Sequence, residues 1–80
     1  MADQWRKDLD WLLANAYPGH GGQTDLARDM RVYSHQIRRA SLISMWLSGA
    51  RQACHENRRA LRILRALKTT ELEGGNQDGD

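Results

Sequence analysis

Glycine and proline divide this chain into segments, and that division constrains its fold more than any other feature of the sequence. The stretch YPGHGG, at residues 17–22, holds one proline and three glycines, and such a cluster ends any helix that precedes it. No glycine or proline then occurs between Gly22 and Gly49. That stretch has room for helices of its own, and Gly49 is a typical residue at a helix C-terminus.

Apolar residues recur at helical spacing before and after these breaks. Over residues 3–16 they form one face of a helix with about 3.6 residues per turn; this face comprises Trp5, Leu9, Leu12, Leu13 and Ala16. A second helix is expected in GQTDLARDM, where Thr24 can act as the N-cap. A third helix ends at Gly49, and a fourth covers about residues 55–72. Its apolar arc comprises Ala60, Leu61, Leu64 and Leu67.

These segments predict an all-α protein, a small four-helix domain with a central helix-turn-helix. Few residues are β-branched and no stretch alternates between polar and apolar residues, so no strand is expected. The domain covers residues 1–72. The remaining residues, 73–80, are rich in glycine and acids and have nothing to bury, which predicts a disordered, flexible acidic tail.

The size and cysteine content of the chain exclude several classes of protein. Eighty residues form one domain with a thin core. The single cysteine, Cys54, excludes an internal disulfide, and with three scattered histidines it makes no zinc site, so we expect neither metal nor cofactor. The sequence shows no signal peptide and no membrane span, which favours a cytoplasmic protein with no membrane contact.

Basic residues are concentrated in the middle of the chain, although the net charge is only +2. Residues 28–68 contain ten Arg or Lys against Asp29 and Glu56, whereas the last ten residues contain four acids and no base. A basic body with an acidic end favours a polyanionic partner for the body.

Three stretches of the sequence resemble a known DNA-binding motif. GGQTDLARDMRV, at residues 21–32, is similar to the opening of the lambda-repressor-like (Cro/XRE-type) helix-turn-helix, and ISMWLSGAR, at residues 43–51, is similar to its close. ENRRALRIL, at residues 56–64, resembles the helix that commonly follows. Small phage and prophage repressors and antitoxin-like regulators look like this. The resemblance covers about residues 11–67 and implies a sequence-specific transcriptional regulator, a repressor that binds double-stranded DNA.

The physical roles of these residues can be stated separately from the resemblance. Ala27 is small where two helices approach closely, and Trp46 with Leu47 would anchor the recognition helix to the core. Gly49 would end that helix, and Arg51 would reach the DNA backbone beyond it. Gln23 and Thr24 lie at a helix N-terminus, where free N–H groups favour a phosphate.

The sequence departs from the family pattern between the two motif helices. Arg31 occupies the position where the motif usually has a glycine in its turn. The separation of Ala27 and Trp46 along the sequence is about six residues longer than usual for the motif. Aligned from the front, Ile37 takes the buried position and Ser34 begins the recognition helix. Aligned from the back, Ile43 takes that position and the helix begins at residues 40–42. We favour a long helix beginning near Ser34, which would read bases or form a contact surface.

Both alignments contribute to the expected DNA interface, in which polar side chains read bases and cations hold phosphates. The interface comprises Gln23, Thr24, Ser34, His35, Gln36, Arg38, Arg39, Ser41, Ser44 and Arg51. A single recognition helix touches few bases, so a homodimer on a palindromic operator is expected. The residues suggested for a dimer or partner interface are Trp11, Leu64, Leu67 and Leu72.

The sequence also bears on two other functions, catalysis and the binding of a host protein. Catalysis is not expected, because Cys54 and His55 point about 100° apart on a helix and YPGHGG lacks the lysine of a phosphate loop. The alternative function is a small phage-type interaction module or inhibitor that uses residues 34–48 and Trp11 to bind a host protein. Salt separates the two, since phosphate contacts weaken as salt rises.

Overall fold

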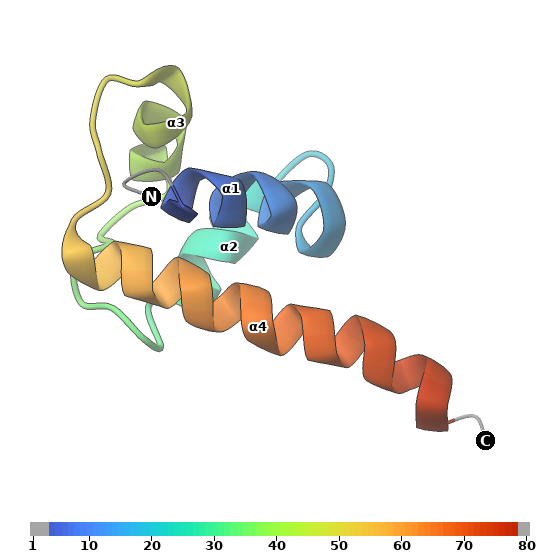
Figure 1. The fold of residues 1–80 in the computed structure, drawn as a ribbon. Coiled ribbons are helices and arrows are strands. Elements are labelled where there is room, and N and C mark those ends of the chain that lie inside the picture. Colours follow the sequence, from blue (N-terminus) through green and yellow to red (C-terminus); the bar gives the residue numbers. More distant parts are fainter. Residues whose placement is uncertain (1–3, 79–80) are drawn as a thin grey trace.

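The computed structural model describes residues 4–78, with side chains up to residue 73, and these residues are entirely helical apart from their connecting loops (Figure 1). The elements are α1 (Gln4–Trp11), η1 (Leu12–Ala16), α2 (Gly22–Met30), α3 (Ser41–Ser48) and α4 (His55–Asp78). The prediction of an all-α fold is therefore confirmed for this part of the chain. None of its helices is both long enough and apolar enough to span a membrane.

The first helix ends at the predicted glycine-rich break. α1 continues into one π-helical turn, η1, which closes with a hydrogen bond of 2.8 Å from the Tyr17 N–H to the Leu12 carbonyl. The chain then folds back so tightly that a Cβ atom on Gly22 would lie 1.9 Å from the Tyr17 carbonyl oxygen. Only glycine fits there. The expected cap at Thr24 is wrong, because α2 starts three residues earlier than that cap requires, at Gly22.

The core is formed where α1, η1 and α2 pack beside α4, with α3 packed against α2. Trp5, Leu9 and Leu12 are buried as their spacing predicts. Trp46 from α3 is also buried, and its ring meets the Trp5 ring edge-on with centroids 6.2 Å apart. Leu47, expected to share this anchoring role, is instead 43% exposed.

The recognition helix predicted to begin near Ser34 is wrong, because α3 begins at Ser41. Residues 34–39 form a loop in which the Gln36 N–H donates to the Ser34 hydroxyl, a local bond that competes with helical pairing. Ile37 and Ile43 are both buried. Each of the two alignments thus identifies one buried isoleucine, and the alignment from the back gives the correct helix.

α4 is the longest element, and its C-terminal half projects beyond the rest of the molecule (Figure 1). Leu64 is buried, whereas Leu67 and Leu72 further along the helix are exposed. The helical backbone continues to Asp78, past the end predicted at residue 72. The proposed tail at residues 73–80 therefore starts as part of this helix, and its last two residues lie outside the described part.

Candidate nucleic-acid interface

The loop between α2 and α3, residues 31–40, is held by one set of contacts within it and by a second set to α4. At its start, the Arg31 guanidinium donates to the carbonyl oxygens of Ile37 at 3.3 Å and Arg38 at 3.2 Å. The backbone φ of Arg31 is −63°, so this position needs no glycine. The Arg31 side chain therefore joins the start of this longer loop to residues near its end, a contact that a short turn would not contain.

The second attachment joins the loop to the first turn of α4. The buried hydroxyl of Ser34 donates to the Asn57 side-chain carbonyl, and the His35 N–H donates to the Glu56 carboxylate. This backbone N–H lowers the pKa of Glu56 below its usual value, because it stabilises the charged carboxylate. Sequence reasoning missed Glu56 and Asn57, since their partners lie more than twenty residues away.

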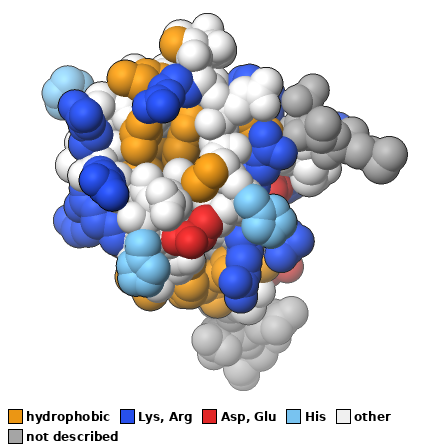
Figure 2. All heavy atoms as spheres, turned by 90° about the vertical axis from the view of Figure 1, so that its left-hand side faces the viewer, with side chains coloured by type: hydrophobic (Ala, Val, Ile, Leu, Met, Phe, Trp, Pro, Cys, Tyr) orange, Lys and Arg blue, Asp and Glu red, His pale blue; other side chains and the backbone are white. Residues whose placement is uncertain are grey.

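The fixed loop places its arginines beside a hollow of about 330 Å³ between α3, the loop at residues 49–54 and the start of α4. We call this the arginine hollow; it is lined by Gln36, Arg38, Arg39, Leu42, Trp46, Arg51, Gln52, Cys54 and Asn57. Three of these described lining residues are arginines and none is acidic. Figure 2 shows this side of the molecule, with blue basic groups around a hydrophobic centre.

The arginine hollow has an uncompensated positive charge. In the described part of the chain, the side chains of Arg38, Arg39 and Arg51 take part in no hydrogen bond or ion pair, and all three residues are exposed. Three like charges around one concavity raise the local potential and attract anions. Guanidinium groups also match the geometry of phosphate oxygens. The hollow is therefore suited to a phosphate group.

α3 presents two short polar side chains to solvent, on a different face from Leu42 and Trp46, which line the hollow. Ser41 and Ser44 are exposed and three residues apart, so they share the outer face of the helix, while Ile43 and Trp46 face the core. Neither serine hydroxyl is hydrogen-bonded within residues 4–78. Ser48 differs, because its hydroxyl donates to the Met45 carbonyl and accepts from the Ala50 N–H.

The C-terminal end of α3 is positioned by backbone and side-chain contacts. Gly49 ends the helix in the left-handed conformation, with φ +84°, and the Arg51 N–H returns to the Met45 carbonyl at 3.3 Å. From α1, Arg6 donates to the Trp46 carbonyl at 3.0 Å and lies 4.5 Å from the centre of the Trp5 ring. Sequence reasoning did not identify Arg6, because nothing in its local pattern marks this distant carbonyl.

The other expected interface residues are distributed over two places. His35 and Gln36 are exposed in the fixed loop, and Gln36 lines the arginine hollow. Ser34 is only 2% exposed, and Asn57 accepts its hydroxyl proton, so its surface is closed to a ligand. Gln23 and Thr24 line a separate hollow at the start of α2, which shares no lining residue with the arginine hollow.

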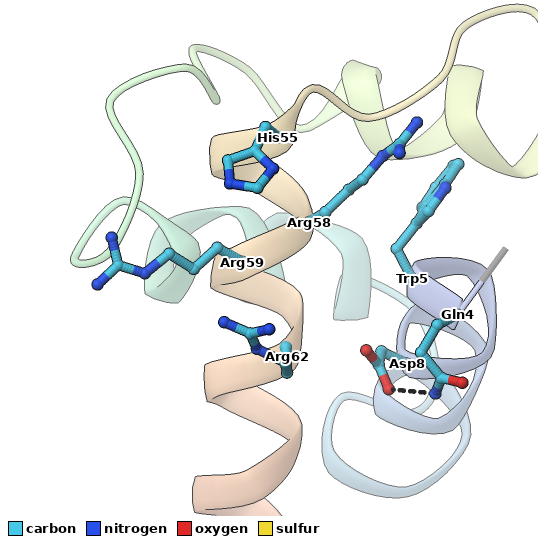
Figure 3. A pocket seen from close by; sticks show the side chains of 7 residues that line it. All are labelled: Gln4, Trp5, Asp8, His55, Arg58, Arg59 and Arg62. Carbon is cyan, nitrogen blue, oxygen red and sulfur yellow. Dashed lines mark hydrogen bonds between the residues drawn. The ribbon is translucent and has the colours of Figure 1, made fainter. Parts of the chain in front are cut away.

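Two arginines of α4 make contacts within the protein. Arg58 donates to the Ala53 carbonyl at 2.7 Å and lies 5.5 Å from the Trp5 ring centre. Arg65 forms an ion pair of 3.0 Å with the buried carboxylate of Asp8. Figure 3 shows Arg58 reaching from α4 toward Trp5, whereas Arg59 points away. Arg58 and Arg65 therefore contribute to the fold.

The residues suggested for a dimer or partner interface differ in their exposure to solvent. Trp11 is half-buried against the core, and the Arg65 guanidinium lies 5.5 Å from its ring centre. Leu64 is buried, which leaves Leu67 and Leu72 as exposed members of the set.

Comparisons of the chain with protein-family models, with curated proteins and with solved structures found no match.

Proposed function

We propose that this protein is a sequence-specific DNA-binding regulator, in which α3 enters the major groove and the arginine hollow holds a phosphate beside it. The observation that carries the proposal is the combination of three unpaired arginines, Arg38, Arg39 and Arg51, with a helix that presents free serine hydroxyls. Cations on phosphates supply affinity and register, whereas hydrogen-bonding side chains on a helix in the groove supply selectivity.

The side chains of α3 suit close approach to base edges. A serine hydroxyl both donates and accepts hydrogen bonds, so Ser41 and Ser44 can pair with any base edge that the groove presents. Both are short, which lets the helix lie deep in the groove. The arginines flank this helix at both ends in sequence, with Arg38 and Arg39 before it and Arg51 after it.

The resemblance of residues 21–32 and 43–51 to the lambda-repressor-like helix-turn-helix supports the same function. It suggests a phage-type repressor that acts as a homodimer on a palindromic operator. In this account the lengthened connection is an adaptation of the motif: the fixed loop brings two arginines to the recognition helix that a short turn could not carry. The hollow at Gln23 and Thr24 would hold a second phosphate at the α2 N-terminus.

The proposal is tested by fluorescence anisotropy with labelled duplexes. The protein is titrated against DNA from upstream of its own gene and against a scrambled duplex, at about 50 and 200 mM salt. We expect tighter binding to the upstream DNA, and weaker binding to both duplexes at the higher salt. Absence of binding, or equal binding to both duplexes, would contradict a sequence-specific regulator.

Replacement of the two serines separates selectivity from affinity. Ser41→Ala/Ser44→Ala should reduce the preference for the upstream duplex about 30-fold, since each of the two lost base contacts costs roughly 1 kcal/mol. Binding to the scrambled duplex should stay unchanged, because the arginines are intact. Ser48→Ala is the matched control, since its hydroxyl bonds within the protein. An unchanged preference in the double variant would remove α3 from the reading role.

A second candidate function is an interaction module for an acidic host protein. It is favoured by one observation: the arginine hollow also contains apolar groups, with Leu42 and Trp46 among its lining residues. An acidic peptide with an apolar anchor would fit such a surface. Such a module would show no sequence-selective binding to the labelled duplexes, so the same titrations separate the two functions.

A further inference from the structure

Three exposed hydrophobic side chains, Val32, Tyr33 and Leu67, line one hollow where α4 passes the turn after α2, and a fourth, Leu72, follows on α4. Among the described residues, five large hydrophobic side chains are exposed, and four of them belong to this group. Val32 is 75% exposed and Leu72 53%, and they are accompanied by Tyr33 and Leu67. Such clustering on a small protein marks an interaction surface, because scattered single residues would be ordinary.

This apolar surface also contains a concavity. A hollow of about 170 Å³ lies between the turn after α2 and the projecting half of α4, lined by Asp29, Val32, Tyr33, Leu64, Leu67, Lys68 and Glu71. Leu72 stands one turn beyond Lys68 on the same helix. The surface therefore offers both a cavity and a protruding leucine next to it. We call it the α4 surface.

Charge along α4 is divided between its two halves. Among the described side chains, the exposed charges in the first half of α4 are Arg59 and Arg62, and those near its end are Glu71 and Glu73. A helix with this distribution is complementary to an antiparallel copy of itself, because the acidic half of one lies along the basic half of the other. A parallel arrangement would place like charges together.

We propose that the α4 surface binds a second copy of this chain, with the two α4 helices antiparallel about a twofold axis. In the register that fits the sequence, Leu72 of one chain lies opposite Leu67 of the second copy, and Glu71 lies opposite Lys68. The symmetry repeats both contacts. Val32 and Tyr33 of each chain cover the flank of the paired leucines.

This inference deepens the proposed function, because it names the surface that would join two recognition helices on one operator. Its physical basis is separate, since it uses none of the residues of the arginine hollow. The test therefore contains no DNA, so that dimerisation and DNA binding can fail independently.

The first experiment is sedimentation equilibrium of the free protein over a micromolar concentration series. We expect a dimer, and we expect Leu67→Glu/Leu72→Glu to weaken it by roughly 100-fold or more, since four leucine side chains are lost from the symmetric complex. Leu47→Glu is the matched control: Leu47 is 43% exposed and Leu67 is 42% exposed, but Leu47 lies on α3. Circular dichroism checks that all variants remain helical.

A charge exchange tests the register itself. Lys68→Glu and Glu71→Lys each place like charges across the interface, so each variant alone should dimerise more weakly than the wild-type protein. Mixed together, the two variants should form a heterodimer, because each new charge then faces its opposite. The 3.4 Å pair between Lys68 and Glu71 within one chain is lost in both variants, so recovery on mixing reports only the contact between chains.

Two results would overturn the proposal. The first is a wild-type protein that stays monomeric up to about 1 mM, a concentration at which even a weak dimer forms. The second is a dimer whose affinity is the same in Leu67→Glu/Leu72→Glu as in the Leu47→Glu control. A dimer that forms normally but shows no recovery on mixing the charge variants would overturn the antiparallel register.

Discussion

Two groups of arginines in this small protein have opposite environments. Arg6, Arg58 and Arg65 contact carbonyl oxygens, a buried carboxylate or tryptophan rings within the protein. Arg38, Arg39 and Arg51 surround one hollow, and their guanidinium groups have no partner in the described residues. The first group contributes to the fold, whereas the charge of the second is not compensated within the described residues. Position, and not the number of basic residues, therefore separates arginines with internal partners from arginines that face solvent.

Among Arg6, Arg58 and Arg65, replacement of Arg65 should cause the largest loss of stability. Arg65→Ala leaves the buried carboxylate of Asp8 without its cation, and we expect a loss of about 2 kcal/mol in the free energy of unfolding. The exposed neighbour Arg62 provides the control, and Arg62→Ala should change stability by less than about 0.5 kcal/mol. Chemical denaturation measures both.

The Arg65 prediction includes a rescue. Asp8→Asn in the Arg65→Ala background should recover part of the lost stability, because an amide costs less than an unpaired carboxylate in the same buried position. If Arg65→Ala and Arg62→Ala prove equally stable, the proposed difference between arginines with internal partners and exposed arginines is contradicted.

Arg58 should show a smaller loss of stability. Arg58→Ala removes a charged hydrogen bond to the Ala53 carbonyl and a contact with the Trp5 ring, together worth about 1–2 kcal/mol. Arg58→Lys should recover only part of this loss, because lysine lacks the planar fork that serves both contacts. Thermal unfolding of these variants beside Arg59→Ala gives the comparison, and equal melting temperatures for Arg58→Ala and Arg59→Ala would refute it.

The smallest expected effect concerns the loop that carries Arg38 and Arg39. The His35 N–H lowers the pKa of Glu56 below 4.5 in the folded protein, so the stabilisation is complete above that pH. It is lost as the pH falls through the lowered pKa. Glu56→Gln should therefore be less stable than the wild type at neutral pH, and this difference should shrink as the pH falls through the lowered pKa of Glu56. A pH-independent difference in denaturation midpoints would show that the carboxylate charge is not involved.

The fold follows from the sequence where local signals are strong. The glycines of YPGHGG and Gly49 mark the helix ends correctly, and the spacing of Trp5, Leu9 and Leu12 identifies the buried face of α1. The helix expected from Ser34 fails for a tertiary reason. Its backbone is held by Glu56 and by the Arg31 guanidinium, and periodicity carries no information about such distant bonds.

The candidate site shows the same division. Arg38, Arg39 and Arg51 were identified from the sequence as clustered cations, and the structure places them around one hollow. The burial of Ser34 could not be predicted, because it depends on Asn57 at the start of another helix. Sequence patterns thus identify candidate ligand-binding side chains. The contacts that orient these side chains, or that bury them as Asn57 does Ser34, come from residues far away in the chain.

The most direct test of the account is the salt dependence of DNA binding in two variants of equal net charge. Arg38→Ala/Arg39→Ala should lower the slope of log affinity against log salt by about 2, since each lost phosphate contact contributes roughly 0.9. Its unfolding free energy should stay within about 0.5 kcal/mol of the wild type. Lys7→Ala/Arg62→Ala, which removes two exposed cations outside the arginine hollow, should retain the wild-type slope. Equal slopes in the two variants would contradict the central claim that the arginine hollow is the phosphate-binding site.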